Sequence, residues 1–319
     1  MRESLEGAGV GAGEYSSHKD VPVLLMVFKR PAHTTVLLNQ LRKIGVRQIY
    51  VSSDAANREE DEVPVDEVRK ILGEGFDWDC SVSFNFREEN RGLRDAVTSS
   101  IDWFFSNVKE GIILEDDCVP SEDFFRLCAS LLPRFRNDSR IMHIAGDNTA
   151  DISIEQDWSY CFVRYPHIWG WATWKSAWKL YDRDLEMWAD FKACGMTPSV
   201  FGSDAERRVW EPIYNRLLKS GIPDTWDWQW SASLAMHDGL AVQPIVNLVS
   251  NTGFGPQATH TKKPGKRSNR RTGSLGVIKH PSIKTRHVDA ERQIFSNTHK
   301  ELGSSKLIRF LKTQVRKVV

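Results

Sequence analysis

Two hydrophobic periods alternate along the first half of this 319-residue chain. Short continuous apolar runs have the length of buried strands. The longer segments between them repeat apolar residues every three or four positions, as helices do when one face packs on a core. This alternation predicts an α/β, Rossmann-like fold with a mostly parallel central sheet flanked by helices. The expected strands are residues 21–28, 47–54, 81–87, 110–117 and 139–148.

The expected helices lie between these strands. Residues 29–45 offer Thr34 or Thr35 as a helix cap and Gly45 as the stop. Ser121 precedes two acids and an apolar run, so it is expected to cap a helix as well. The remaining helices are expected at residues 67–75 and 92–108.

Beyond about residue 151 the alternation stops. The aromatic segment 158–255 has many short polar turns, which predicts an α+β region that completes a site begun by the first half. Residues 262–298 have the composition of an irregular basic linker. The chain therefore divides into a flexible N-terminus (1–20), an α/β half (21–150), a second half of the same domain (151–261) and a basic C-terminal extension (262–319).

Charge is distributed unevenly between these parts. The net charge is +1, but residues 262–319 contain sixteen Lys and Arg against three Asp and Glu, so the rest of the chain is acidic. A basic extension favours an anionic partner, although it can also be merely solvated. Phe295 and Phe310 are the only Phe, Tyr or Trp residues in it, which disfavours nucleic acid. Residues 300–319 have the pattern of a basic amphipathic helix suited to an anionic membrane surface.

Cysteine and tryptophan usage narrow the class of protein. Five cysteines without a C-x-x-C spacing argue against a disulfide framework and a thiolate zinc site. Together with the absence of a signal-like or membrane-spanning apolar run, they predict a cytoplasmic protein, peripheral to the membrane at most. Ten of the twelve Trp lie between Trp158 and Trp230. They indicate either flat apolar surface for a sugar or nucleotide, or a second Trp-rich core.

Charged side chains follow three of the expected strands. Lys29 and Arg30 follow the first, Asp54 the second, and the triplet Glu115–Asp117 the fourth. In parallel α/β sheets, ligands bind beyond the carboxyl ends of the strands. Adjacent carboxylates repel one another unless a cation lies among them, and Mg²⁺ or Mn²⁺ combines a few such oxygens with waters and substrate phosphates. The alternatives are a solvated acidic loop, ordinary surface charge for the cations and a strand-end cap for Asp54.

Several segments, in this order, resemble the GT-A nucleotide-sugar glycosyltransferases, closest to the N-acetylglucosaminyltransferase I type and bacterial family-2-like relatives. The resemblance covers about residues 21–260. The segments that carry it are VFKRP (27–31), VSSD (51–54), NRGLRDA (90–96), ILEDD followed by PSEDFF (113–125), YPHIWGWATWKSAW (165–178) and TWDWQW with its continuation (225–255).

The resemblance implies a donor site in the first half of the chain. It makes Asp117 the ligand of a divalent Mn²⁺ or Mg²⁺ ion that bridges the donor diphosphate, and His260 a further candidate ligand. A lone histidine such as His260 is otherwise most often structural. The residues that it implies for contact with the nucleotide sugar are Phe28, Lys29, Arg30, Asp54, Glu115, Asp116 and one of Arg91 and Arg94.

The resemblance also implies an acceptor site in the second half. An inverting transfer needs one carboxylate that takes the acceptor's proton, and Asp227 matches that position. The family has two adjacent acids before a Trp where this chain has only Asp227 before Trp228, so a capping role for Asp227 is the alternative. The residues expected to line the acceptor cleft are His167, Trp169, Trp171, Trp226 and Trp228.

These features favour a metal-dependent, inverting glycosyltransferase. It is expected to move a sugar from a nucleotide diphosphate, a UDP-sugar first of all, to a glycan or lipid-linked acceptor. One alternative is a sugar-phosphate nucleotidyltransferase, but the loop after the first strand, FKRPAHTT, lacks the glycines that such enzymes use around a triphosphate. The other is a non-catalytic protein that binds glycan or a membrane surface.

Overall fold

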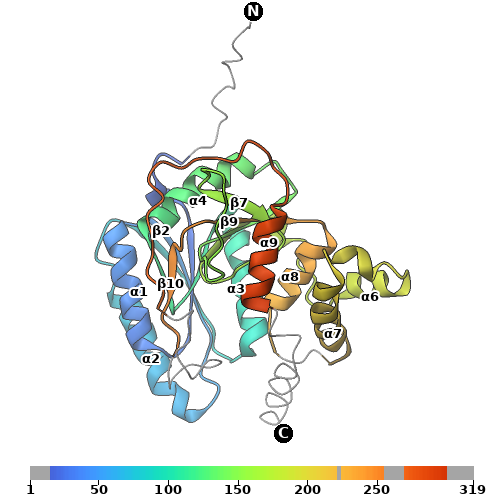
Figure 1. The fold of residues 1–319 in the computed structure, drawn as a ribbon. Coiled ribbons are helices and arrows are strands. Elements are labelled where there is room, and N and C mark those ends of the chain that lie inside the picture. The colour runs from blue at the N-terminus through green and yellow to red at the C-terminus, as the bar shows by residue number, and fades with distance from the viewer. Residues whose placement is uncertain (1–14, 221–223, 255–268, 300–319) are drawn as a thin grey trace, which may run out of the picture.

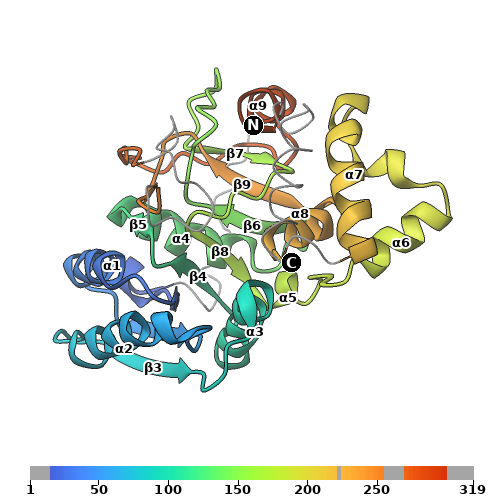
Figure 2. The same ribbon diagram turned by 90° about the horizontal axis from the view of Figure 1, so that it is seen from below.

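The computed structural model describes residues 15–220, 224–254 and 269–299. Its main feature is an eight-stranded sheet in the order β3-β2-β1-β4-β8-β6-β9-β7 (Figures 1 and 2). Four of the seven neighbouring pairs are parallel, namely β3-β2, β2-β1, β1-β4 and β6-β9. The expected α/β fold with a mostly parallel sheet is therefore confirmed. The strands of this sheet are β1 (Val23–Val27), β2 (Gln48–Ser53), β3 (Ser81–Phe86), β4 (Glu110–Glu115), β6 (Ile141–Ala145), β7 (Tyr160–Val163), β8 (Trp171–Trp174) and β9 (Leu240–Pro244).

Helices cover both faces of the sheet. In Figure 2, α1 and α4 lie on one face, α3 and α8 on the other, and α6 and α7 extend away from the sheet. Strand β8 shows why: the Trp174 indole donates to the Leu132 carbonyl of α4, whereas Trp171 faces the opposite way and stacks on Trp226 before α8. The helices are α1 (Pro31–Ile44), α2 (Glu59–Glu74), α3 (Gly92–Asn107), α4 (Glu122–Phe135), α5 (Lys175–Trp178), α6 (Glu186–Ala193), α7 (Asp204–Ser220), α8 (Asp227–Met236) and α9 (Val288–Ile294), with short helical turns at His18–Asp20, Thr197–Val200 and Phe295–His299.

Local sequence explains most helix ends, with one correction. Gly45 ends α1 in the left-handed conformation, at φ 77°, and the Ser121 hydroxyl accepts the Phe124 amide at the start of α4, both as expected. Helix α1 begins at Pro31 rather than at a threonine cap, because proline has no amide hydrogen to lose in the first turn. Thr34 lies inside that turn and its hydroxyl donates to the Arg30 carbonyl.

Helix α2 is longer than the expected residues 67–75, because it starts at Glu59. The four acids of its first turn, residues 59–62, stabilise the positive end of the helix dipole. Its buried positions Val65, Val68 and Leu72 continue one apolar stripe through the single proline of the helix.

A second, two-stranded sheet was not expected from the sequence. It pairs β5 (Cys118–Pro120) with β10 (Val249–Asn251) in antiparallel orientation. The pairing joins residues about 130 positions apart, so it brings the chain after residue 251 against the acidic triplet.

Part of each chain end is integrated into the fold. The Tyr15 hydroxyl donates to Glu110, and residues 18–20 form a helical turn, so residues 15–20 are not the loose segment that composition suggested. Helix α9 lies within the stretch expected to be irregular. Its Ala290 and Ile294 are buried in the core. The proposed membrane-binding segment 300–319 lies outside the described residues.

Glu291 is the main polar anchor of α9. Its carboxylate accepts the Arg164 backbone amide at 2.8 Å and the Arg286 guanidinium at 2.6 Å, while Arg164 also pairs with Glu206 of α7 at 2.7 Å. The Glu291 side chain is only 3% exposed. This network connects the extension, β7 and the helical region in one buried cluster.

We expect Glu291→Ala to lower the free energy of unfolding by about 3 kcal/mol, because it leaves Arg164 and Arg286 without their shared carboxylate in a buried setting. Urea unfolding followed by tryptophan fluorescence measures this change. The matched control is Asp289→Ala, which removes an exposed pair with Arg292 in the same helix and should cost under about 1 kcal/mol. Equal, small effects of the two variants would contradict the anchoring role.

Among the described residues no helix is both long and apolar enough to cross a bilayer.

Candidate active site at the carboxyl edge of the sheet

The register of the parallel strands brings the expected polar residues to one edge. Val27 of β1 pairs with Ser53 of β2, and Met26 pairs with Glu115 of β4, so these three strands end at the same level. The residues that follow them therefore lie along one edge of the sheet. We call this the strand-edge site, and its members are Arg30, Asp54, Glu115, Asp116, Asp117 and Asp227.

Arg30 is the cation that faces the acids. Its Nη1 donates to Asp116 Oδ1 at 3.1 Å and to Asp117 Oδ2 at 2.7 Å. Lys29, by contrast, pairs with Asp61 of α2 and lies over the ring of Phe28, at 5.3 Å from its centroid. The two adjacent cations of the sequence thus have different partners, and only Arg30 contacts the acidic triplet.

The chain after β10 encloses Asp117. The Asn251 side-chain amide donates to Asp117 Oδ1 at 3.3 Å, and the Thr252 backbone amide donates to the Asp117 carbonyl at 2.8 Å. At Gly253, a Cβ atom would lie 1.9 Å from Asp117 Oδ2, so no side chain fits there. His33 of α1 contacts the Thr252 carbonyl at 3.1 Å and completes this wall. Asn251, Thr252, Gly253 and His33 were not expected in the site. The β5–β10 pairing brings the first three to it, and His33 lies in the first turn of α1, just after Arg30.

The acidic triplet carries more negative charge than Arg30 neutralises. Burial and the charges of Asp117 and Asp116 raise the pKa of Glu115 to about 8, and Arg30 offsets this only in part. Burial also raises the pKa of Asp116 to about 6, against the opposing charge of Arg30. A protein that keeps such acids together at neutral pH loses stability, and an additional cation would restore it.

Glu115→Gln should stabilise the protein at high pH. Below pH 4.5 the glutamic acid is protonated in both the folded and unfolded chain, and between pH 4.5 and 8 the unfolded chain ionises first, so stability falls over that interval. Glutamine removes this loss, on the order of 1–3 kcal/mol at pH 8. Urea unfolding at pH 5 and pH 8 measures it, with exposed Glu89→Gln as control. If Glu115→Gln loses as much stability as the wild type between pH 5 and pH 8, then ionisation of Glu115 does not destabilise the folded protein.

The donor set of the triplet suits a hard divalent cation. Asp116 Oδ1 and Asp117 Oδ2 converge on one guanidinium nitrogen, so both oxygens can reach a single positive centre. Within the described ranges no three His, Cys, Asp or Glu side chains form a ready-made metal site. Two carboxylates fit Mg²⁺ or Mn²⁺ when phosphate oxygens and waters supply the other ligands. His260, the other candidate ligand, lies outside the described residues.

Asp54 is buried and has a backbone partner. Its carboxylate accepts the Arg91 amide, at 3.1 Å from Oδ2, and the Asn90 side chain donates to the Ala55 carbonyl at 2.7 Å. The Arg69 guanidinium of α2 donates to the Asp54 carbonyl at 3.2 Å. These contacts align the loop before α3 with the end of β2, which is the capping role that the sequence left open.

The Arg94 side chain lies near residues from the second half of the chain. Its Nε is buried and lies 3.7 Å from Asp95 and 4.0 Å from Asp224, which also accepts the Leu93 amide at the start of α3. Burial raises the pKa of the Tyr181 hydroxyl, which the positive charge of Arg94 opposes and the negative charge of Asp227 increases. Arg94 and Asp227 therefore both lie near Tyr181.

Asp227 is the first residue of α8 and accepts a hydrogen bond from the Thr225 hydroxyl. Its charge contributes to the raised pKa of Glu115, so the two carboxylates are near enough to interact electrostatically. Asp227 therefore interacts with an acid that lies about 110 residues earlier in the chain, and its role as the base stays a prediction.

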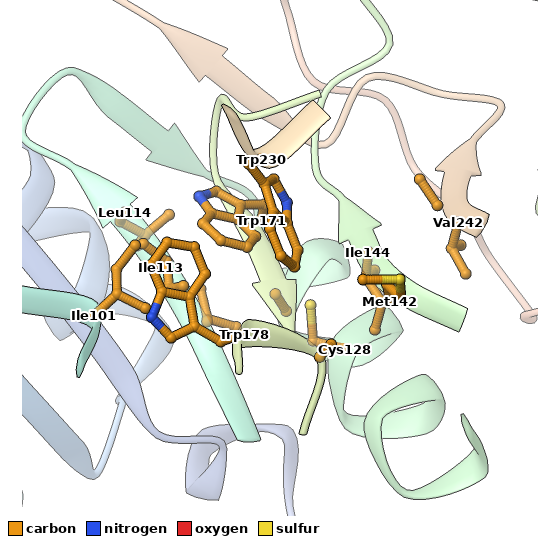
Figure 3. Packing of buried hydrophobic residues seen from close by; sticks show 14 of the residues in the cluster. Ile101, Ile113, Leu114, Cys128, Met142, Ile144, Trp171, Trp178, Trp230 and Val242 are labelled. Atoms are coloured by element: carbon orange, nitrogen blue, oxygen red, sulfur yellow. The ribbon is translucent and has the colours of Figure 1, made fainter. Parts of the chain in front are cut away.

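Two of the tryptophans assigned to the acceptor cleft belong to the core instead. Trp171 and Trp226 are 1% and 3% exposed and stack on each other with ring centroids 5.6 Å apart. Figure 3 shows Trp171 beside Trp230 and Trp178 in this packing. Such rings have no free face for a sugar, so this part of the prediction is corrected.

Trp169 and Trp228 remain partly exposed, and Trp169 packs edge-to-face on Phe254 at 5.5 Å. His167 lies 3.2 Å from Asp147, which the sequence did not single out. The aromatic segment thus contributes mainly a second core, with Trp169, His167 and Trp228 at its margin.

A separate cavity of about 420 Å³ lies between α3 and residues 175–183. None of the acids of the strand-edge site lines it. Its walls are Thr98, Asp102, Phe105, Ser106, Lys175, Trp178, Lys179, Tyr181 and Arg183.

Comparisons with known proteins leave the family open. No protein-family profile matches the chain, and no curated protein matches its sequence. Solved structures with some similarity include a UDP-glucose pyrophosphorylase complexed with UDP-glucose, which is 12% identical with a TM-score of 0.24. The match covers 45% of this chain and 62% of the other, less than two thirds of its length. At this level of similarity the neighbour carries no inference about activity.

Proposed function

We propose that this protein is a metal-dependent, inverting glycosyltransferase that takes its sugar from a nucleotide diphosphate, a UDP-sugar first of all. One observation carries the proposal. Arg30, Asp116 and Asp117 converge at the carboxyl edge of the parallel strands, Asp54 follows the neighbouring strand β2, and the charge of Asp227 acts on Glu115. This is where doubly wound sheets bind nucleotides, and it combines cation-binding and phosphate-binding groups in one place.

Asp116 and Asp117 would hold the divalent cation. When bound, the cation neutralises charge on the donor diphosphate and so makes the nucleotide a better leaving group. Arg30 lies within hydrogen-bond distance of both carboxylates and can bind a phosphate oxygen from the same position. Glu115, at the end of β4, is suited to a sugar hydroxyl, because a protonated carboxyl both donates and accepts hydrogen bonds.

The nucleotide base and ribose belong beside β1 and β2 in this proposal. Phe28 offers a partly exposed ring at the end of β1, and the loop that Asp54 aligns offers Arg91 at the surface. Arg94 is the better diphosphate candidate of the two arginines, because its guanidinium lies on the side of Tyr181 and Asp227. Lys29 pairs with Asp61 of α2, so in this proposal it stabilises the loop after β1 and does not contact the donor directly.

Asp227 would act as the general base. It takes the proton of the acceptor hydroxyl as that oxygen attacks the anomeric carbon from the face opposite the nucleotide. The Thr225 hydroxyl holds one carboxylate oxygen in place. Trp228 beside it is partly exposed and can stack on the acceptor sugar. A glycan or a lipid-linked glycan is the acceptor class proposed.

A screen of nucleotide sugars for Mn²⁺-dependent hydrolysis tests this function, because glycosyltransferases slowly transfer sugar to water. We expect one donor to release its nucleoside diphosphate, and EDTA to stop the release. A nucleotidyltransferase would instead form pyrophosphate from a nucleoside triphosphate and a sugar 1-phosphate. Pyrophosphate release under those conditions, with no donor hydrolysis, would overturn the proposal.

A further inference from the structure

Two ionisable side chains outside the proposed mechanism meet at the same edge of the sheet. Asp147 follows the end of β6 by two residues, and His167 precedes the start of β8 by four. Strands β6 and β8 are antiparallel neighbours, with Ala145 opposite Trp171, so both residues lie beyond the carboxyl end of β6. The His167 Nδ1 atom is 3.2 Å from Asp147 Oδ2.

The loops that carry this pair meet each other near the end of β4. The Gly146 amide donates to the Gly170 carbonyl at 2.8 Å, and a Cβ on Gly146 would lie 2.5 Å from that carbonyl, so the two loops can approach only through glycine. Gly170 in turn lies against Leu114 of β4, one residue before Glu115. The loop that carries His167 therefore crosses the end of β4.

Burying the Asp147 carboxylate is energetically unfavourable, and its hydrogen bonds within the protein compensate for this only in part. The residue is 1% exposed, and its Oδ1 has no hydrogen-bond partner among the described residues. Burial disfavours its charge, but His167 and the Thr149 hydroxyl outweigh this and keep its pKa below the ordinary value. A buried carboxylate with an unpaired oxygen is unusual, and such groups concentrate where function requires them.

A comparison with His143 shows what distinguishes His167. His143 is fully buried, and both of its ring nitrogens have partners: Nδ1 accepts the Trp230 indole, and Nε2 donates to the His167 carbonyl. It therefore has a structural role. In His167 the Nδ1 atom is buried, lies 3.2 Å from Asp147 Oδ2 and has no hydrogen-bond partner in the described structure, and no described residue bonds to Nε2. A proton on Nδ1 directed at Asp147 leaves the Nε2 lone pair as a hydrogen-bond acceptor.

We infer that Asp147 and His167 form a dyad that binds the acceptor, in which His167 Nε2 accepts a hydrogen bond from a sugar hydroxyl. Asp147 is the positioning residue, because it holds the ring in the Nδ1-protonated tautomer. The ligand class is an uncharged, polyhydroxylated sugar at the end of the acceptor. This inference rests on the proposed function for the identity of the ligand, but the tautomer of His167 does not depend on it.

The tautomer is tested first, by nitrogen NMR of histidine-labelled protein at pH 8.5, with His167→Gln used to assign the signal. We expect a proton on Nδ1 and none on Nε2 in the wild type. In Asp147→Asn we expect a mixture of tautomers, because the new amide can donate to Nδ1 instead of accepting from it. A ring protonated on Nε2 in the wild type, or one that Asp147→Asn does not alter, would overturn the dyad.

Acceptor binding is tested with methyl glucoside, galactoside, mannoside and N-acetylglucosaminide as probes. With the donor found by the screen, we expect His167→Ala to raise the acceptor KM at least about tenfold, in line with loss of a sugar-binding hydrogen bond, and to leave donor hydrolysis within about twofold. His167→Gln should retain part of the affinity. His280→Ala, which removes a histidine that contacts Tyr160 on β7, is the control.

The possible outcomes separate this inference from the proposed function. Equal loss of hydrolysis and transfer in His167→Ala would indicate a structural role and overturn the acceptor role, as would an unchanged KM. If the wild type hydrolyses no donor, the proposed function fails, and the same glycosides are titrated against the His167 Nε2 resonance. A shift of that resonance then supports the dyad as a sugar site, and no shift with any of the four overturns it.

Discussion

Asp117→Ala is expected to abolish the Mn²⁺ dependence of nucleotide binding. In the wild type, Mn²⁺ should tighten the binding of UDP, so that the Kd without Mn²⁺ is at least about 100 times the Kd with it. In the variant this ratio should fall to about one. The physical reason is that Asp117 supplies one of the two carboxylate oxygens that, among the described residues, are seen to converge on the Arg30 guanidinium. Isothermal titration with UDP, with and without Mn²⁺, measures both constants.

The same variant should leave weak, metal-independent binding. Without Asp117, Arg30 keeps Asp116 as a carboxylate partner and can still attract a diphosphate. Turnover should fall by about a thousandfold or more, because the leaving diphosphate loses its charge compensation. Asp66→Ala, an exposed acid of α2, is the control and should change neither quantity. Unaltered Mn²⁺ dependence in Asp117→Ala would refute the metal assignment.

Asp227→Asn is expected to bind donor normally and to lose sugar transfer. Asparagine keeps the shape and the hydrogen bond from Thr225 but cannot accept the acceptor's proton, so kcat should drop by about 10²–10⁴-fold while the Kd for UDP and Mn²⁺ stays within a few fold. Single-turnover transfer and UDP titration on the same preparation measure the two quantities.

Asp238→Asn gives the matched control for that experiment. It makes the same chemical change just beyond the other end of α8, at an exposed position with φ 51° that asparagine tolerates well. Normal turnover in Asp227→Asn would remove Asp227 as the base and leave it as an acid in the first turn of α8, where it favours the helix dipole. Loss of both turnover and UDP binding would place Asp227 in the donor site instead.

The fold class was readable from the chain because each strand and helix has its own hydrophobic period. The five strands expected between residues 21 and 148 all appear. Each begins within about two residues of its expected start. The expected ranges run up to about three residues past the observed ends, mostly because they included the polar residues that follow a strand. The clustering of Arg30 and Asp54 with the triplet followed from the same pattern, since parallel strands end at one edge.

Features that depend on distant partners were missed. From composition, residues 288–294 were expected to belong to a basic linker. In the structure Ala290 and Ile294 pack in the core and Glu291 accepts hydrogen bonds from two arginines, and these contacts stabilise a short helix. Flat rings at Trp171 and Trp226 were assigned to a sugar cleft, whereas they bury each other. A side chain's type shows what it can contact, and only its neighbours decide whether it is covered.

Local periodicity and strand polarity are properties of the chain, so they were enough to predict an α/β protein whose acids and cations follow the strand ends. The folded structure sets which of these groups meet. It paired Arg30, and not Lys29, with the acids, brought Gly253 against Asp117 and joined Asp147 to His167. These contacts join residues that are far apart along the chain, and the packing of the sheet edge, which no local pattern encodes, sets their distances.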